Sequence, residues 1–68
     1  MRRVALPERI EIILVPDSEG YWLAEFPQLP GLHTFGTSLR EAKRNAAQAL
    51  KTWFKEHARA GIPVRVRR

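Results

Sequence analysis

Four acidic residues in the N-terminal half of the chain are the first candidates for chemistry. Clustered carboxylates can hold the metal ions that activate water for phosphodiester cleavage. Two of these residues fall in a stretch with the composition of a solvent-exposed turn, which favours solvated surface charge over a metal centre. We therefore expect no catalytic residue, no metal and no cofactor. The four residues are Glu11, Asp17, Glu19 and Glu25.

The two histidines are the next candidates, as general bases or as metal ligands. His33 stands in a short apolar stretch, and His57 lies on the apolar side of an expected helix, near its end. Neither has a serine or carboxylate partner at a spacing typical of a triad or a ligand pair, and the chain contains no cysteine. Packing or a helix-end contact is therefore favoured over catalysis for both.

Positive charge is concentrated in the C-terminal half of the chain. Residues 1–37 carry three basic and five acidic groups, net −2, whereas residues 38–68 carry nine basic and two acidic groups, net +7. On a helix that advances about 100° per residue, one set of basic side chains falls within a single arc opposite the apolar positions. Such a stripe can contact phosphates, but it is also typical of a solvated helix face. Its members are Arg40, Arg44, Lys51, Lys55 and Arg59.

The length of the chain sets limits on its architecture. A chain of 68 residues forms one small domain, which we divide into an arm at 1–8, a core at 9–60 and a terminal strand with a basic tail at 61–68. Because so small a domain buries little surface, we expect a homo-oligomer with a dimer as its basic unit. No apolar run could span a membrane and no signal-peptide pattern is present, so a cytoplasmic location without a membrane partner is expected.

Alternating apolar residues predict three strands, at 9–15, 21–26 and 32–35. The first is apolar on both sides in its second half, which suggests that its outer face is covered, for example by another subunit. In the second, Trp22, Ala24 and Phe26 are expected to face the helix. Turn residues separate the strands and follow the third: Gly20, Pro27, Pro30, Gly31 and Gly36.

A helix is predicted from Ser38 to about Ala60. Ser38 and Glu41 have the spacing of a capping box, in which the hydroxyl accepts from the Glu41 amide and the carboxylate reaches back to the Ser38 amide. Trp53 lies on the apolar stripe and is expected in the core. A short strand follows, at an edge because it carries Pro63. The predicted fold class is α+β, a β-β-β-α-β two-layer sandwich with an antiparallel sheet and one helix on one face.

The stretch from Gly20 to Ala42 joins these signals in one motif. It reads G-Y-x-x-A-E-x-P-x-L-P-G, then T-x-G, then a helix opening with S-L-x-E-A. Over about residues 9–60 the chain therefore resembles the HicB-like antitoxins, the small partners of HicA-type ribonuclease toxins. The matching residues are Gly20, Tyr21, Ala24, Glu25, Pro27, Leu29, Pro30, Gly31, Thr34, Gly36, Ser38, Leu39, Glu41 and Ala42.

This resemblance implies a fold and a function. The family domain is similar to a degenerate ribonuclease H unit with β-β-β-α-β order and no catalytic carboxylates. Family members typically bind the toxin through this domain and assemble as dimers or tetramers, and many add a C-terminal DNA-binding domain. Because this chain ends eight residues after its expected helix, we expect a stand-alone form without that DNA-binding domain, which leaves operator binding open.

Two functional hypotheses follow, and they use opposite charges. As a non-enzymatic antitoxin, the chain would offer its acidic half to an RNA-binding toxin, with Glu11, Asp17, Glu19 and Glu25 as the candidate contacts. As a nucleic-acid-binding module, it would instead use the basic helix stripe and the arginine tail at 65–68. Steep salt dependence would distinguish phosphate contacts from a largely apolar protein interface.

Overall fold

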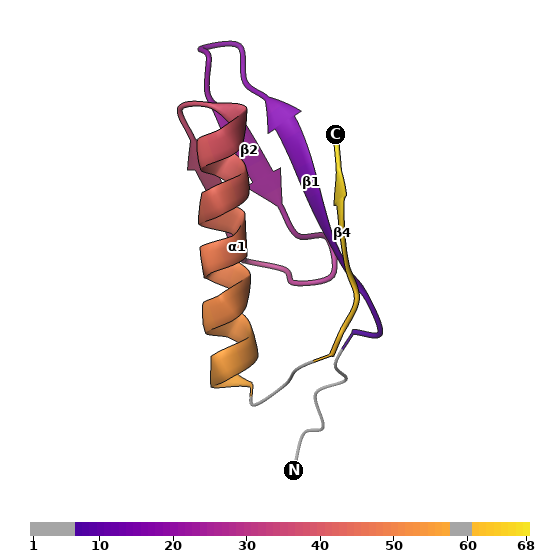
Figure 1. The fold of residues 1–68 in the computed structure, drawn as a ribbon. Coiled ribbons are helices and arrows are strands. Elements are labelled where there is room, and N and C mark those ends of the chain that lie inside the picture. The colour runs from indigo at the N-terminus through magenta and orange to yellow at the C-terminus, as the bar shows by residue number, and fades with distance from the viewer. Residues whose placement is uncertain (1–6, 58–60) are drawn as a thin grey trace.

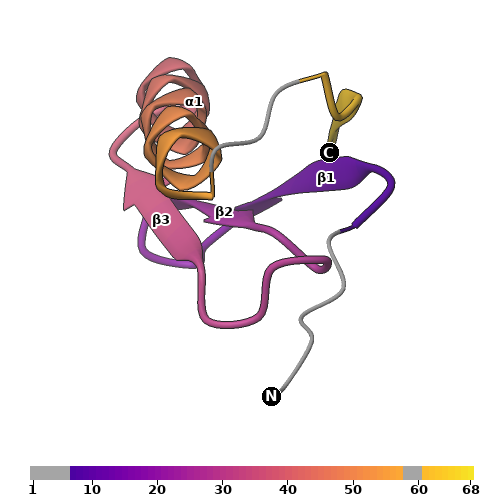
Figure 2. The same ribbon diagram turned by 90° about the horizontal axis from the view of Figure 1, so that it is seen from below.

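The fold is a four-stranded sheet with one helix on one face, as the views in Figures 1 and 2 show. The computed structural model describes residues 7–57 and 61–68, so most of the predicted arm and Arg59 lie outside the described residues. The α+β class and the β-β-β-α-β order are confirmed. The elements are β1 (Ile10–Pro16), β2 (Trp22–Glu25), β3 (His33–Gly36), α1 (Leu39–Glu56) and β4 (Val64–Arg67).

The sheet is mixed, with strand order β3-β2-β1-β4. β1 pairs antiparallel with β2, and β2 pairs antiparallel with β3, but β4 pairs parallel with β1. The prediction of an antiparallel sheet is therefore wrong for the last pair. Two hairpins leave β3 parallel to β1, and α1 then returns the chain across the sheet, so β4 runs in the same direction as both. β4 lies at an edge, as predicted, although Pro63 comes just before the strand and not within it.

The core lies between α1 and the face of the sheet that α1 covers. Ala24 is fully buried and Phe26 is 3% exposed, while Trp22 packs against the core from its margin, so the predicted orientation of these three residues is confirmed. Trp53, which was expected in the core, is only half-buried. The buried residues of α1 are smaller: Ala42, Ala46 and Leu50. The buried residues are Ile10, Ile12, Leu14, Ala24, Phe26, Leu29, Ala42, Ala46 and Leu50.

The start of α1 is capped as predicted, with one difference in the partner. The Ser38 hydroxyl accepts a hydrogen bond from the Glu41 amide at 3.1 Å. The Glu41 carboxylate, however, accepts from the Thr37 amide at 2.9 Å and from the Thr37 hydroxyl at 3.2 Å, and not from the Ser38 amide. Thr37 offers two donors to the same oxygen, which explains why the carboxylate turns to the residue before the cap.

The end of α1 comes earlier than predicted. The helix ends at Glu56 and His57 is its cap, whereas the predicted end at Ala60 lies outside the described residues. His57 leaves the helical conformation at φ −99° and ψ 5°, and its Nδ1 lies 3.0 Å from the Trp53 carbonyl oxygen. Its ring is exposed and stacks on Trp53 with 4.5 Å between centroids, so His57 makes the expected helix-end contact from outside the core.

Gly36, the last residue of β3, lies where the strand passes closest to the helix, and this explains the glycine at this position of the motif. A Cβ atom added at Gly36 would lie 2.8 Å from the carbonyl carbon of Glu41 and closer still to the amide nitrogen of Ala42. Backbone cannot move aside as a flexible side chain can, so only glycine lets the strand end run this close to the first turn of α1. The side-chain amide of Asn45 ties the same two elements together by donating to the Phe35 carbonyl at 2.8 Å.

Candidate protein-binding surface

α1 covers one face of the sheet (Figure 2), and exposed apolar side chains gather on the opposite face near the β1–β2 turn. The register places Val15 opposite Leu23, and Leu23 opposite Phe35, so the three side chains form a row across three strands. Val15 and Leu23 are each 36% exposed, Tyr21 is 41% exposed and Phe35 is 57% exposed. We call these four residues the apolar patch.

The apolar patch has a defined shape. The rings of Tyr21 and Phe35 meet edge to face, with 6.0 Å between centroids and 88° between planes. Together with Leu23 and Asp17 they line a shallow hollow in the surface. The amide of Asp17 donates to the Tyr21 carbonyl at 2.7 Å, which holds the turn against the patch. A carboxylate therefore stands at the margin of an otherwise apolar depression.

Three of the four acidic residues singled out from the sequence border the apolar patch. Asp17 and Glu19 lie in the turn between β1 and β2, where the Glu19 amide donates to the Asp17 carboxylate at 3.3 Å. Glu25 is two positions beyond Leu23 on β2 and so points to the same face. All three are exposed. We call Asp17, Glu19 and Glu25 the acidic rim.

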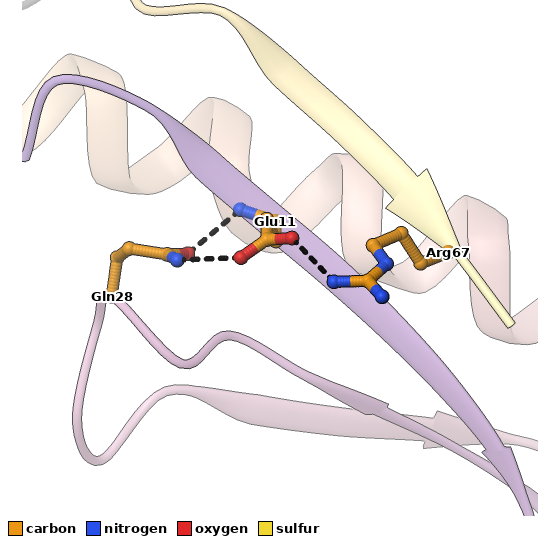
Figure 3. A network of polar contacts seen from close by, with 3 residues as sticks. All are labelled: Glu11, Gln28 and Arg67. Atoms are coloured by element: carbon orange, nitrogen blue, oxygen red, sulfur yellow. Dashed lines mark hydrogen bonds and ion pairs between the residues drawn. The ribbon is translucent and has the colours of Figure 1, made fainter.

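Glu11, the fourth of these acidic residues, is not part of the acidic rim, because Arg67 and Gln28 bind its side chain. Its carboxylate accepts from Arg67 Nη1 at 2.9 Å and from Gln28 Nε2 at 2.9 Å, while the Glu11 backbone amide donates to the side-chain oxygen Oε1 of Gln28 at 2.8 Å (Figure 3). The hydrogen bond from Arg67, followed by that from Gln28, holds the pKa of Glu11 below its usual value. Glu11 therefore fastens β1 to β4 and to the β2–β3 loop, and its charge is already neutralised by a partner.

The basic stripe lies on the other side of the molecule. Arg40, Arg44, Lys51 and Lys55 are exposed on α1, opposite its buried residues, as predicted, and Arg59 lies outside the described residues. The stripe faces away from the sheet, whereas the apolar patch lies on the far face of the sheet. The two candidate interfaces therefore lie on separate sides of the molecule.

The remaining chemical candidates are dispersed. His33 is exposed on β3, directly opposite Glu25 in the ladder. Within residues 7–57 and 61–68, no three histidine, aspartate or glutamate side chains gather as a metal site would require. Among the same residues, no helix combines the length and the apolar character needed to cross a membrane.

Sequence reasoning did not assemble the apolar patch. The signals were present, since the first strand is apolar on both sides and Tyr21, Leu23 and Phe35 alternate outward on the next two strands. Only the cross-strand register shows that these separate alternations meet in one row. The pairing of β1 with β4 places Glu11 opposite Arg65, which sets it apart from Asp17, Glu19 and Glu25.

No protein-family model matches the chain, and neither a curated protein nor a solved structure matches it. The resemblance to the HicB-like antitoxins accordingly rests on the motif between Gly20 and Ala42.

Proposed function

We propose that this chain is a non-enzymatic, antitoxin-like domain that binds and neutralises a HicA-type ribonuclease toxin. The proposal rests on one observation, the exposed apolar patch bordered by the acidic rim. The motif between Gly20 and Ala42 supplies the kind of partner, because it resembles that of antitoxins whose toxins act on RNA.

The chemistry of the surface suits such a partner. A ribonuclease that holds RNA presents positive charge around its active site, and Asp17, Glu19 and Glu25 would attract that charge during the encounter. Once the two surfaces meet, burial of Phe35, Tyr21 and Leu23 would supply most of the affinity, since aromatic side chains at the centre of an interface contribute strongly. The rim would then set the association rate, and the patch the dissociation rate.

The partner to test is a HicA-type protein encoded by the neighbouring gene. We expect the two proteins to co-purify and co-expression to restore the growth of toxin-expressing cells. The Phe35→Ser variant should lose rescue while keeping its melting temperature, because the ring is 57% exposed. If the wild-type chain neither co-purifies with this protein nor protects against it, the antitoxin proposal is wrong.

The acidic rim has its own test and a matched control. Changing Glu19 and Glu25 together to Lys should slow association with the toxin. Changing Glu8 and Glu56 to Lys alters net charge by the same amount at exposed positions outside the rim, and should slow association less. Equal effects of the two double variants would mean that only net charge matters, which would remove the rim from the interface.

A second function is favoured by the exposed basic stripe on α1. In this alternative the chain is a nucleic-acid-binding module that contacts phosphates through Arg40, Arg44, Lys51 and Lys55. Changing Arg44, Lys51 and Lys55 together to Glu should abolish binding to RNA or DNA at low salt without unfolding the domain. If the wild type fails to shift nucleic acid at low salt, or the triple variant still binds, the stripe is not a nucleic-acid site.

A further inference from the structure

The outer edge of β4 is an open hydrogen-bonding surface. β4 is the last strand of the sheet, and among residues 7–57 and 61–68 no strand pairs with its other side. The Pro63 carbonyl accepts from the Ile10 amide at 2.9 Å, which orients the backbone groups of Pro63 towards β1. Because successive residues of a strand point their backbone groups to alternate sides, those of Val64 and Val66 point away from β1.

The side chains of β4 divide into an apolar and a positive set. Val64 pairs with Ile10 and Val66 with Ile12, so both valines lie on the face that carries the core, yet they are 41% and 50% exposed. α1 leaves them open because it lies over the β2 and β3 side of the sheet (Figure 2). Arg65 and Arg67 alternate to the opposite face.

We propose that the edge of β4 binds an extended segment of a partner protein in which acidic and apolar residues alternate. The segment would add a strand to the four-stranded sheet and bond to the outward backbone groups of Val64 and Val66. Paired residues share a face, so its apolar side chains would cover the two valines and its carboxylates would lie beside Arg65 and Arg67. This site is independent of the toxin-binding proposal, which uses β1, β2 and β3 at the other end of the sheet.

A second copy of this chain fits the same edge poorly. Two β4 strands paired with each other would set Arg65 and Arg67 against the same arginines, and like charges facing each other across a ladder are destabilising. Arg67 is neutralised in part by Glu11 within its own subunit. Arg65 makes no ion pair within the described residues, so its charge remains available to an acidic partner.

The experiment compares two short synthetic peptides, one alternating Val with Glu and the other alternating Val with Lys. Calorimetric titration of the full chain should show binding of the Glu peptide and at least about tenfold weaker binding of the Lys peptide. Amide exchange at Val64 and Val66 should slow when the Glu peptide binds. The Arg65→Glu variant should reverse the preference between the two peptides.

Val66→Pro tests the backbone directly, because it removes an amide that points away from β1 and so costs no bond within the sheet. It should abolish peptide binding, whereas Val66→Thr keeps both the amide and the branched shape and should bind. If Val66→Pro does not fold, the charge reversal in Arg65→Glu still decides the matter. Equal binding of both peptides, binding of neither, or a self-associated state that depends on β4 would overturn the proposal.

Discussion

Glu11 and Arg67, which are 56 positions apart in the sequence, meet across the parallel pair of β1 and β4 in an ion pair of 2.9 Å. The two side chains come from diagonal positions of the ladder, since Glu11 is opposite Arg65 and Arg67 is opposite Ile13. Gln28 completes the contact from the β2–β3 loop (Figure 3). One carboxylate thus links three segments that are distant in the sequence, and it does so on the face of the sheet that carries the apolar patch.

This contact predicts a pH dependence with a definite sign. The hydrogen bond from Arg67 lowers the pKa of Glu11 in the folded state, so the contact stabilises the fold above the ordinary pKa of an unfolded glutamate. That contribution is lost as the pH falls through the lowered pKa of the folded state. Glu11→Gln should reduce the melting temperature at neutral pH and flatten its acid dependence, whereas Glu25→Gln, at an exposed position, should leave the melting temperature at neutral pH unchanged. An unchanged acid slope in Glu11→Gln would contradict the assignment.

Gly36→Ala should be strongly destabilising, by about 3 kcal/mol or more, because the added methyl group would collide with the backbone of α1. Gly31→Ala is the matched comparison. It adds the same group where no atom lies within 4 Å, so only the positive φ of 90° opposes it and the cost should be about 1 to 2 kcal/mol. Denaturant unfolding of both variants measures the difference. Equal losses would mean that the strand and helix can separate at Gly36.

Ser38→Ala should cost about 1 kcal/mol of unfolding free energy, because the Glu41 amide would lose its acceptor. Ser38→Asp keeps an acceptor at the same position and should retain most of the stability. Denaturant titration of the two variants provides the measurement. If Ser38→Asp lost as much stability as Ser38→Ala, the cap would not be the source of the effect.

Leu50→Ala should be more destabilising than Trp53→Ala, although the tryptophan is much the larger residue. Leu50 is 5% exposed and lies within the core, so its truncation should cost about 2 to 5 kcal/mol. Trp53 packs against the core from its margin and is only half-buried, so part of its ring is already in water. Its other aromatic contacts are with Phe54 and His57. Melting temperatures of the two variants test the order, and the reverse order would place Trp53 deeper than the structure does.

We also expect copies of the chain to associate with each other through the apolar patch. A mass above 7.9 kDa is expected from light scattering of the chain alone, with the apolar patch as the contact between copies until a toxin takes the place of the second copy. Phe35→Ser should shift the population towards the monomer without changing the melting temperature at low concentration. A wild-type chain that stays monomeric at micromolar concentration would refute the prediction.

The sequence by itself determined the local structure of this chain. Alternation of side chains gave the three N-terminal strands to within one residue at each end, and the Ser38–Glu41 spacing gave the start of the helix. These features are readable because each depends on residues only a few positions apart. The end of the helix was predicted less well, since sequence marks a helix boundary only loosely: the prediction was Ala60, whereas α1 ends at Glu56 and His57 is its cap.

Tertiary structure alone decided which separate residues act together. The parallel direction of β4 follows from the path of the chain through α1, and it is this pairing that places Arg67 beside Glu11. The row of Val15, Leu23 and Phe35 exists only because the register of two antiparallel pairs aligns them. A composition count treats Glu11, Asp17, Glu19 and Glu25 as equivalent charges, but the ladder gives the first a partner within the chain and leaves the other three around an open surface.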